Sequence, residues 1–346
     1  MRISDAVLQN LRAVVELPAI EGGRYEILEK IGSGGMGTVF RANDLELKRE
    51  VAVKVMDFSD KDADLADRMI REAQTIARLE HPGIVPIHDV GKLADGRIFY
   101  AMKLVRGERL DQNFVKTKPL NEKLRVFQRV CEALAFAHAQ NVIHRDVKPE
   151  NIMIGAYGEV LLMDWGLAKL RGAPSAPCHE DQASAIIQTA ASKTENQTLH
   201  GQVLGTPDYM SPEQAQGRVE LIDHRSDIFA LGGVLRFLVG SGKNSSDYSN
   251  RKSSLRFKFE NFFSRPPKPL VAIYRKALEA KKERRYDAAL KISEDVEAFL
   301  SGQPVSAYKE NVFEALLRWS KQNKFILILV SVYILSRLLL AFFLQN

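Results

Sequence analysis

Cysteine is scarce in this sequence. The 346 residues include only Cys131 and Cys178, which stand far apart and lack the spacing of metal ligands. A disulfide framework is therefore not supported, and the chain suits a reducing compartment such as the cytosol. Apolar residues are plentiful: they make up 45% of the chain, which excludes a disordered protein and is enough for two lobes and a modest appendage.

Signatures of nucleic-acid binding are missing, although 49 Lys and Arg residues outnumber 43 Asp and Glu residues. The basic excess gathers between Lys243 and Lys324, without zinc-finger spacing, a basic heptad or an aromatic RNA-binding motif. We therefore expect no nucleic-acid partner, and we assign the excess to a solvated face or to proximity to a membrane.

A long apolar run is absent from residues 1–24, so we do not expect a secretory signal there. Apolar residues recur instead at three- and four-residue spacings, which predicts an amphipathic helix. We interpret this segment as an N-terminal extension that packs on the domain or is loosely attached to it, with a docking role as the alternative. The apolar positions are Ile3, Val7, Leu8, Leu11, Val14 and Val15.

Residues 142–151 concentrate polar chemistry in a stretch that is predicted to begin as a buried strand and to turn at Pro149. Asp146 is suited to accept a proton from a hydroxyl, Lys148 to hold a phosphate, and Asn151 to ligate a hard cation. The set indicates phosphoryl transfer, with an ordinary polar turn as the alternative. The stretch resembles the catalytic loop of protein kinases, H-R-D-x-x-x-x-N. A lysine two residues after the aspartate, as Lys148 follows Asp146, is similar to the pattern of the serine/threonine kinases.

Glycines at positions 32, 34 and 37 give the segment 32–37 a G-x-G-x-x-G spacing between two predicted strands. Backbone N–H groups without neighbouring side chains can approach phosphate oxygens closely. Dinucleotide-binding folds share this G-x-G-x-x-G spacing but open a helix after it, whereas the β-branched and aromatic residues 38–40 favour a strand. The segment is therefore predicted as a hairpin tip. A third strand at 51–55 carries Lys54, which resembles the kinase β3 lysine.

The resemblance to protein kinases implies where ATP and its metal bind. Lys54 would contact the phosphates and pair with Glu72 of a predicted helix at 64–79; for Glu72, a solvated helix charge is the alternative. Asp164-Trp165-Gly166 resembles the D-F-G motif, so Asp164 and Asn151 are the expected ligands of Mg²⁺, with Mn²⁺ as the alternative metal. The expected nucleotide contacts are Ile31, Gly32, Ser33, Gly34, Gly35, Met36, Gly37, Val39, Ala52, Lys54, Glu72, Met102, Lys103 and Val105, and the expected catalytic residues are Asp146, Lys148 and Asn151.

Further strands are predicted at 85–90 and 98–103, and a long helix at 120–140. Residues 104–107 resemble the hinge between the two lobes of a kinase, and backbone groups around 103–105 would meet the adenine. Met102 is either the back of that pocket or plain core.

The polar stretch 167–204 resembles a kinase activation segment. It ends in the sequence from Gly205 to Glu213, which resembles the segment that cradles a peptide substrate. The resemblance implies structural roles for Asp227, which would hold the catalytic loop, and for Arg285, which would pair with Glu213. Between residues 240 and 269 the match is poor, in the region that usually carries a docking surface.

Residues 325–344 form a long apolar run. About 20 residues of helix rise about 30 Å, which is enough to cross the hydrocarbon core of a membrane. Arg337 interrupts the run at a cost of roughly 2.5–3.5 kcal/mol, which the many Leu, Ile, Phe and Val residues offset. We predict a single-pass helix after a basic juxtamembrane linker at 303–324, with the catalytic domain in the cytoplasm; a buried or interfacial helix is the alternative.

Together these motifs resemble the bacterial Hanks-type (eukaryotic-like) serine/threonine protein kinases. The implied fold is α+β and bilobal over residues 25–302: an antiparallel β-sheet N-lobe with an αC helix at 25–105 and a mostly helical C-lobe at 106–302, followed by one C-terminal transmembrane helix. The implied activity is transfer of the ATP γ-phosphate to Ser/Thr hydroxyls of proteins, with self-association for autophosphorylation. The alternatives are a nucleotide-binding pseudokinase scaffold and a kinase-like small-molecule phosphotransferase.

Overall fold

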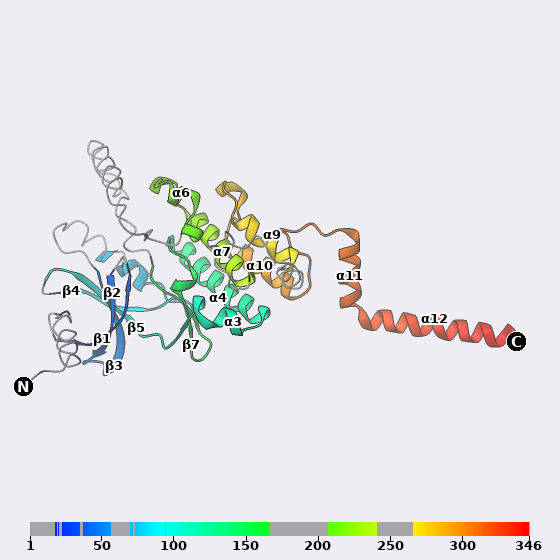
Figure 1. Cartoon of the computed structure of the whole chain (residues 1–346), viewed down its shortest axis with the longest axis horizontal. Coiled ribbons are helices and arrows are strands. Elements are labelled where there is room, and N and C mark those ends of the chain that lie inside the picture. Colours follow the sequence, from blue (N-terminus) through cyan, green and yellow to red (C-terminus); the bar gives the residue numbers. More distant parts are fainter. Residues whose placement is uncertain are drawn as a thin grey trace, which may run out of the picture.

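Figure 1 shows a β-sheet lobe, a helical lobe, and two C-terminal helices that extend away from the helical lobe as an orange and red arm. The bilobal α+β architecture agrees with the prediction. This computed structural model describes residues 18, 20, 23–34, 37–56, 70–71, 73–93, 95–165, 207–240 and 266–345.

The first lobe is built on one antiparallel sheet with the strand order β1-β2-β3-β5-β4. Strand β3 lies at its centre, and residues 51–55 are all buried, as expected for a β-branched run that packs on both faces. One face forms a small core with Phe40 and Val53, and the other joins the main core through Ala52 and Met102. The strands are β1 (Tyr25–Gly34), β2 (Gly37–Asp44), β3 (Arg49–Val55), β4 (Ile87–Lys92) and β5 (Ile98–Lys103). Of the predicted helix at 64–79, residues 70–71 and 73–77 are described and are helical.

The second lobe packs its helices around the main core, beside a small sheet with the order β6-β7-β8. Helix α4 buries Leu124, Phe127 and Leu134, which repeat at helical spacing. The sheet strands are β6 (Gly107–Arg109), β7 (Ile152–Gly155) and β8 (Val160–Leu162). The longer helices of this lobe are α4 (Leu120–Ala139), α7 (His224–Val239), α9 (Lys268–Ala277) and α10 (Ala289–Leu300). Short helical turns are η1 (Leu110–Phe114), α3 (Val115–Thr117), η2 (Pro149–Asn151), η4 (Pro207–Tyr209), α6 (Pro212–Ala215), η5 (Val219–Leu221) and η7 (Lys282–Arg284).

The prediction that the catalytic loop begins as a strand is wrong. Asn141 has a left-handed φ of 58°, and the N–H of Val142 donates to the carbonyl of Ala137 at 2.9 Å. This closes the C-terminus of α4, so the backbone at Val142 serves the end of a helix and not a sheet ladder.

The arm consists of α11 (Val312–Gln322) and α12 (Lys324–Gln345). The sequence prediction missed α11 inside the linker at 303–324. Asn311 caps it by accepting a hydrogen bond from the N–H of Glu314 at 2.8 Å, and this N-x-x-E capping box is a local sequence signal. Helix α12 covers the predicted apolar run. Among the residues whose side chains the structure describes, no helix is long and apolar enough to cross a membrane. The transmembrane helix therefore stays a prediction.

Candidate active site

One buried carboxylate holds the catalytic loop, residues 142–151. Asp227, in the first turn of α7, accepts hydrogen bonds from the backbone N–H groups of His144 and Arg145, both at 2.8 Å. It also accepts one from Nε2 of His138 at 2.8 Å. Burial raises the pKa of the Asp227 carboxyl, but the hydrogen bonds and charges of these neighbours lower it by more. Its pKa therefore lies below the usual value. A charged acceptor thus fixes the loop backbone.

His144 connects the catalytic loop to the end of β8. Its Nδ1 accepts from the N–H of Asp146 at 3.2 Å, so the ring proton lies on Nε2, which donates to the carbonyl of Met163 at 2.9 Å. Burial lowers the pKa of His144, which keeps the ring neutral. Met163 in turn donates its N–H to the carbonyl of Asn151 at 2.8 Å. These bonds set the spacing between the loops that carry Asp146 and Asp164.

The three predicted catalytic side chains meet in the loop. Asn151 Nδ2 donates to the backbone carbonyl of Asp146 at 2.8 Å and to its Oδ2 at 3.0 Å. The Lys148 ammonium lies 2.9 Å from the same Oδ2. These contacts orient the Asp146 carboxylate, whose side chain is 15% exposed and so remains accessible to a small group. Because Asn151 uses its amide nitrogen here, its amide oxygen is the atom suited to a cation.

Lys54 joins β3 of the first lobe to the end of β8. Its ammonium lies 2.8 Å from Oδ1 of Asp164, and its side chain is 7% exposed. Tyr100, opposite Lys54 in the β3–β5 register, is a second hydrogen-bond partner. Burial alone would lower the pKa of Lys54, but Tyr100 and Asp164 outweigh it and raise that pKa, so the ammonium stays charged. Tyr100 belongs to no motif recognised in the sequence, and its signal is its place in the strand register.

Asn151 and Asp164 supply oxygen donors for a hard cation. Asp164 has a left-handed φ of 52°, which aspartate tolerates better than most residues. Across the described residues, no cluster of three or more His, Cys, Asp or Glu side chains could hold a metal ion by itself. A two-donor site suits Mg²⁺, which keeps several waters and takes further ligands from nucleotide phosphates.

The β1–β2 hairpin presents the glycine-rich segment at its tip. A Cβ at Gly37, where φ is 140°, would come within 2.2 Å of the carbonyl oxygen of Val55, so the sheet itself requires glycine there. Gly32 and Gly34 differ. Among the residues that the structure describes, a Cβ at Gly32 would meet only Val39, at 3.9 Å, and one at Gly34 would meet nothing within 4 Å. Protein packing does not require glycine at these two positions, whereas a loop that approaches phosphate oxygens would require it.

The residues predicted to surround the adenine lie on adjoining strands. Ala52 pairs with Met102 in the register, and both are buried. The N–H of Lys103 donates to the carbonyl of Pro86 at 3.1 Å, so recognition of adenine at Lys103 would fall to its carbonyl. The other predicted contacts around this pocket are partly or fully exposed: Ile31, Ser33, Val39 and Val105.

Trp165 stands where the D-F-G motif has phenylalanine. Its ring lies 4.6 Å from the ring of His144, and the residue is 5% exposed. A larger aromatic ring therefore fills the space behind the catalytic loop. Its buried Nε1 has no hydrogen-bond partner within the part of the chain that the structure describes.

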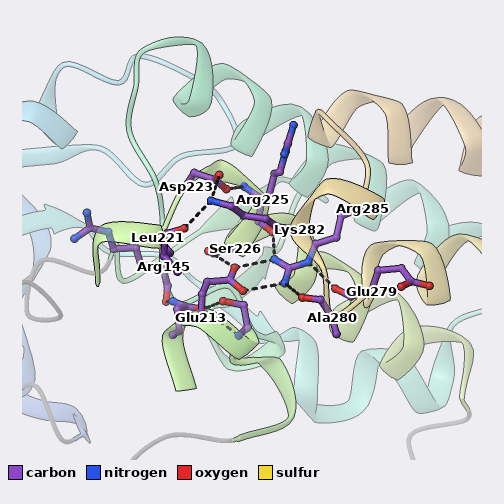
Figure 2. A network of polar contacts seen from close by, with 12 residues as sticks. Arg145, Glu213, Leu221, Asp223, Arg225, Ser226, Glu279, Ala280, Lys282 and Arg285 are labelled. Atoms are coloured by element: carbon purple, nitrogen blue, oxygen red, sulfur yellow. Dashed lines mark hydrogen bonds and ion pairs between the residues drawn. The ribbon is translucent and has the colours of Figure 1, made fainter. Parts of the chain in front are cut away.

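Figure 2 shows the polar network behind residues 207–215. Arg285 holds the Glu213 carboxylate with hydrogen bonds of 2.8 and 2.9 Å, and the Ser226 hydroxyl donates to it at 2.7 Å. The guanidinium also donates to neighbouring backbone carbonyls. Burial raises the pKa of Glu213, but Arg285 and Ser226 outweigh this and lower it to about 2. The predicted pairing of Glu213 with Arg285 is confirmed.

Ser211 and Gln214 tie this segment to the catalytic loop. The hydroxyl and the N–H of Ser211 donate to Gln214 Oε1 at 3.0 and 3.1 Å. Gln214 Nε2 then donates to the carbonyl of Arg145 at 2.9 Å, where Arg145 has a left-handed φ of 65°. The sequence prediction did not include Gln214, although the S-x-x-Q capping box is a local signal for it.

Some predicted site residues lie outside the described residues. They are Gly35, Met36, Glu72, Gly166, the activation segment 167–204, Gly205 and Thr206. The N-terminal extension at 1–24 and the region 240–269 are also largely outside.

Residues 25–302 match the family described as protein kinase domain. The chain is 35% identical over 309 residues to the serine/threonine-protein kinase PknD of Protochlamydia amoebophila, across 82% of this chain and 30% of that protein. It is 32% identical over 303 residues to the serine/threonine-protein kinase PknD of Chlamydia trachomatis serovar D, across 81% of this chain and 32% of that protein. The chain thus spans about a third of the length of these relatives.

Among solved structures, the chain is similar to the Mycobacterium tuberculosis PknI kinase domain. The TM-score is 0.56 at 23% sequence identity, across 81% of this chain and 98% of that chain. At this identity the similarity concerns the fold alone.

Proposed function

Because the chain belongs to the protein kinase family, we propose that it transfers the γ-phosphate of ATP to serine and threonine hydroxyls of proteins. The observation that carries this proposal is the contact of Asp146 with both Lys148 and Asn151 in one loop. His144 links this loop to Met163, the residue before Asp164. The similarity to serine/threonine-protein kinases of two chlamydial organisms supports the choice of acceptor.

Each side chain of the constellation has a role that its contacts support. Asp146 would orient the acceptor hydroxyl and take its proton, and Lys148, 2.9 Å from that carboxylate, would stabilise the charge on the transferred phosphoryl group. Lys54 would hold the nucleotide phosphates from the first lobe. Mg²⁺ bound by Asn151 and Asp164 would neutralise phosphate charge. Catalysis here is positioning and electrostatics more than covalent chemistry.

Substitution of Asp146 tests this proposal. Asp146→Asn keeps the size of the side chain and removes the proton acceptor, so phosphate transfer should fall about 10²- to 10⁴-fold while the Kd for ATP changes little. Transfer of labelled phosphate to a generic basic protein measures the rate. Hydrolysis of the labelled protein and separation of its phosphorylated Ser, Thr and Tyr then identify the acceptor type. Asp95→Asn, in the β4–β5 turn, is the matched control and should keep full activity.

Two outcomes would contradict the proposal. If Asp146→Asn matches the wild-type rate, Asp146 is not the base. If wild-type protein binds ATP but transfers nothing to protein, a scaffold role or a small-molecule acceptor explains the fold better.

We also propose that α12 anchors the kinase in a membrane with its catalytic domain in the cytoplasm. Apolar side chains of this helix are open to its surroundings, including Phe325 at 88% and Leu329 at 72% exposed. Its one charged residue after Lys324 is Arg337, whose Nε lies 3.2 Å from the Tyr333 hydroxyl. The basic residues lie before the apolar run, which favours a cytoplasmic domain.

Cell fractionation tests the anchor. The full chain should resist extraction from membranes at alkaline pH, and protease added to intact spheroplasts should spare the kinase domain. Leu329→Arg/Val332→Arg should release the protein into the soluble fraction, because each mid-membrane arginine costs roughly 2.5–3.5 kcal/mol. Recovery of wild-type protein without detergent would count against a membrane span.

A further inference from the structure

Helix α11 is amphipathic, and its polar side faces the protein. Glu314, Arg318 and Gln322 follow one another at four-residue spacing and therefore share a face. Glu314 lies 2.7 Å from the ammonium of Lys268 on α9, and Gln322 donates to the carbonyl of Gly302 at 2.8 Å. The polar side of α11 is thus docked against the helical lobe.

The opposite side of α11 is apolar and exposed. We call it the apolar face of α11. A surface helix of a soluble domain usually buries this side. Here the exposed fractions are 83% for Val312, 78% for Phe313, 60% for Leu316, 62% for Leu317 and 47% for Trp319.

A basic groove of about 570 Å³ adjoins the docked side of α11. Lys268, Arg275, Lys276 and Arg284 line it, together with the acidic Glu279. Lys268 belongs both to this groove and to the contact with Glu314, so the groove lies beside the polar side of the helix. The groove, with its further cations, therefore begins beside that polar side.

We propose that the apolar face of α11 and the basic groove together form a membrane-contact surface, with α11 lying flat in the interface of a bilayer that contains anionic lipids. In such a helix the apolar side enters the acyl boundary while the polar side lies at the level of the headgroup phosphates. The groove cations are placed at that level and are complementary to anionic headgroups.

The neighbouring helix favours a bilayer over a second copy of this chain as the occupant. Exposed apolar side chains lie on both helices, with Phe313 of α11 78% exposed and Phe325 of α12 88% exposed, so both helices need apolar surroundings. Only the five polar residues 320–324 separate Trp319 from Phe325. A second copy could cover the apolar face, but it would bring the same cations to the groove. An anionic bilayer satisfies both surfaces. This inference rests on the proposed membrane location.

Trp319 provides the measurement, because the chain has two tryptophans and the other, Trp165, is 5% exposed in the kinase core. The full chain is reconstituted in vesicles of zwitterionic lipid with and without anionic lipid. We expect Trp319 emission to shift to shorter wavelength and to be quenched by lipids brominated near the headgroup. Trp319→Phe should remove this signal.

Two double variants separate the two halves of the surface. Leu316→Glu/Leu317→Glu should abolish the quenching in every vesicle. Arg275→Glu/Arg284→Glu should abolish only the gain that anionic lipid produces, since each cation near an anionic surface contributes about a fivefold change in binding. Lys48→Glu/Lys116→Glu reverses as many exposed charges elsewhere and is the matched control, which should behave as wild type.

The same samples distinguish failure of this inference from failure of the proposed function. Kinase activity toward a soluble protein, and resistance to alkaline extraction, are measured in parallel. Trp319 emission that remains typical of water in both vesicle types would overturn the inference, even if transfer and anchoring are intact. Quenching that depends on protein density and not on lipid charge would also overturn it, because a second copy would then cover the helix.

Discussion

At the scale of single residues, the carboxylates of this protein divide into those behind the site and those that face it. Asp227 and Glu213 are 1% and 8% exposed and are surrounded by donors, so their role is to hold backbone and helices in place. The Asp146 and Asp164 side chains are 15% and 35% exposed and would line the proposed reaction site. Burial thus separates structural acids from chemical ones.

Glu213 should make stability depend on pH. Its folded pKa of about 2 lies below the ordinary 4.5, so its contribution is full above pH 4.5 and is lost as the pH falls toward 2. Glu213→Gln should lower the free energy of unfolding at neutral pH by about 3 kcal/mol, since it leaves Arg285 buried without its charge partner, and should flatten this acid dependence. Urea denaturation across that range measures both effects.

The control for this prediction is Glu294→Gln, which removes an exposed pair with Lys291 at 3.1 Å. It should leave the stability at neutral pH close to that of the wild type, because exposed ion pairs contribute little. An equal loss in both variants would mean that the network in Figure 2 adds nothing beyond a surface pair.

At the scale of elements, two different causes explain the glycines of the β1–β2 hairpin: close packing within the sheet and the proposed approach of nucleotide phosphates. Gly37 is required by the close approach of Val55, while a Cβ at Gly34 would meet no atom of the described residues within 4 Å. The three glycines of one motif therefore do not share one reason for being glycine. Substitution separates the two reasons.

Gly37→Ala should destabilise the protein by more than about 1 kcal/mol, because its Cβ would overlap the Val55 carbonyl and φ is 140°. Gly34→Ala should leave the melting temperature nearly unchanged and raise the KM for ATP, if the loop lies over phosphate. Thermal melting and ATP titration of both variants provide the comparison. Unchanged ATP kinetics in Gly34→Ala would remove the argument that a ligand selects this glycine.

At the scale of the whole molecule, the membrane anchor proposed above would bring copies of the kinase together at high local concentration. Arg145 directly precedes Asp146, and an arginine in this position would bind a phosphate carried by the segment 167–204 through charge-assisted hydrogen bonds. The backbone of Arg145 is held by Asp227 and Gln214, so its position is set from both sides.

We therefore expect autophosphorylation between molecules at Thr194, at Thr198 or at both, because these two residues shortly precede in the sequence the segment from Gly205 that is expected to cradle a peptide. Wild-type kinase should phosphorylate an Asp146→Asn copy in the same vesicle, and Thr194→Ala/Thr198→Ala should lower activity. Ser175→Ala, early in the same segment, is the control. Full activity of the double alanine variant, with no phosphate mapped between 167 and 204, would leave Arg145 a structural role only.

Local sequence by itself determined the hairpin around the glycine-rich segment, helix α4 and the identity of the catalytic loop. These features depend on neighbours a few residues apart: β-branched residues after glycine, apolar residues at helical spacing, and polar groups within one turn. The predicted strand at the start of the catalytic loop was wrong, because the left-handed backbone at Asn141 ends α4 and redirects the chain. Helix α11 was missed, although its capping box is a local sequence signal.

Only the tertiary structure decided which distant groups meet. Lys54 and Asp164 are 110 residues apart, and Arg145 and Asp227 are 82 apart, so no spacing in the sequence encodes their 2.8 Å contacts. The same holds for Tyr100 beside Lys54 and for Gln214 at the carbonyl of Arg145. An amphipathic pattern likewise shows that α11 has two sides, but not which side docks. The polar side docks because the Lys268 ammonium meets Glu314 and the Gly302 carbonyl meets Gln322. Only the folded chain brings these groups together.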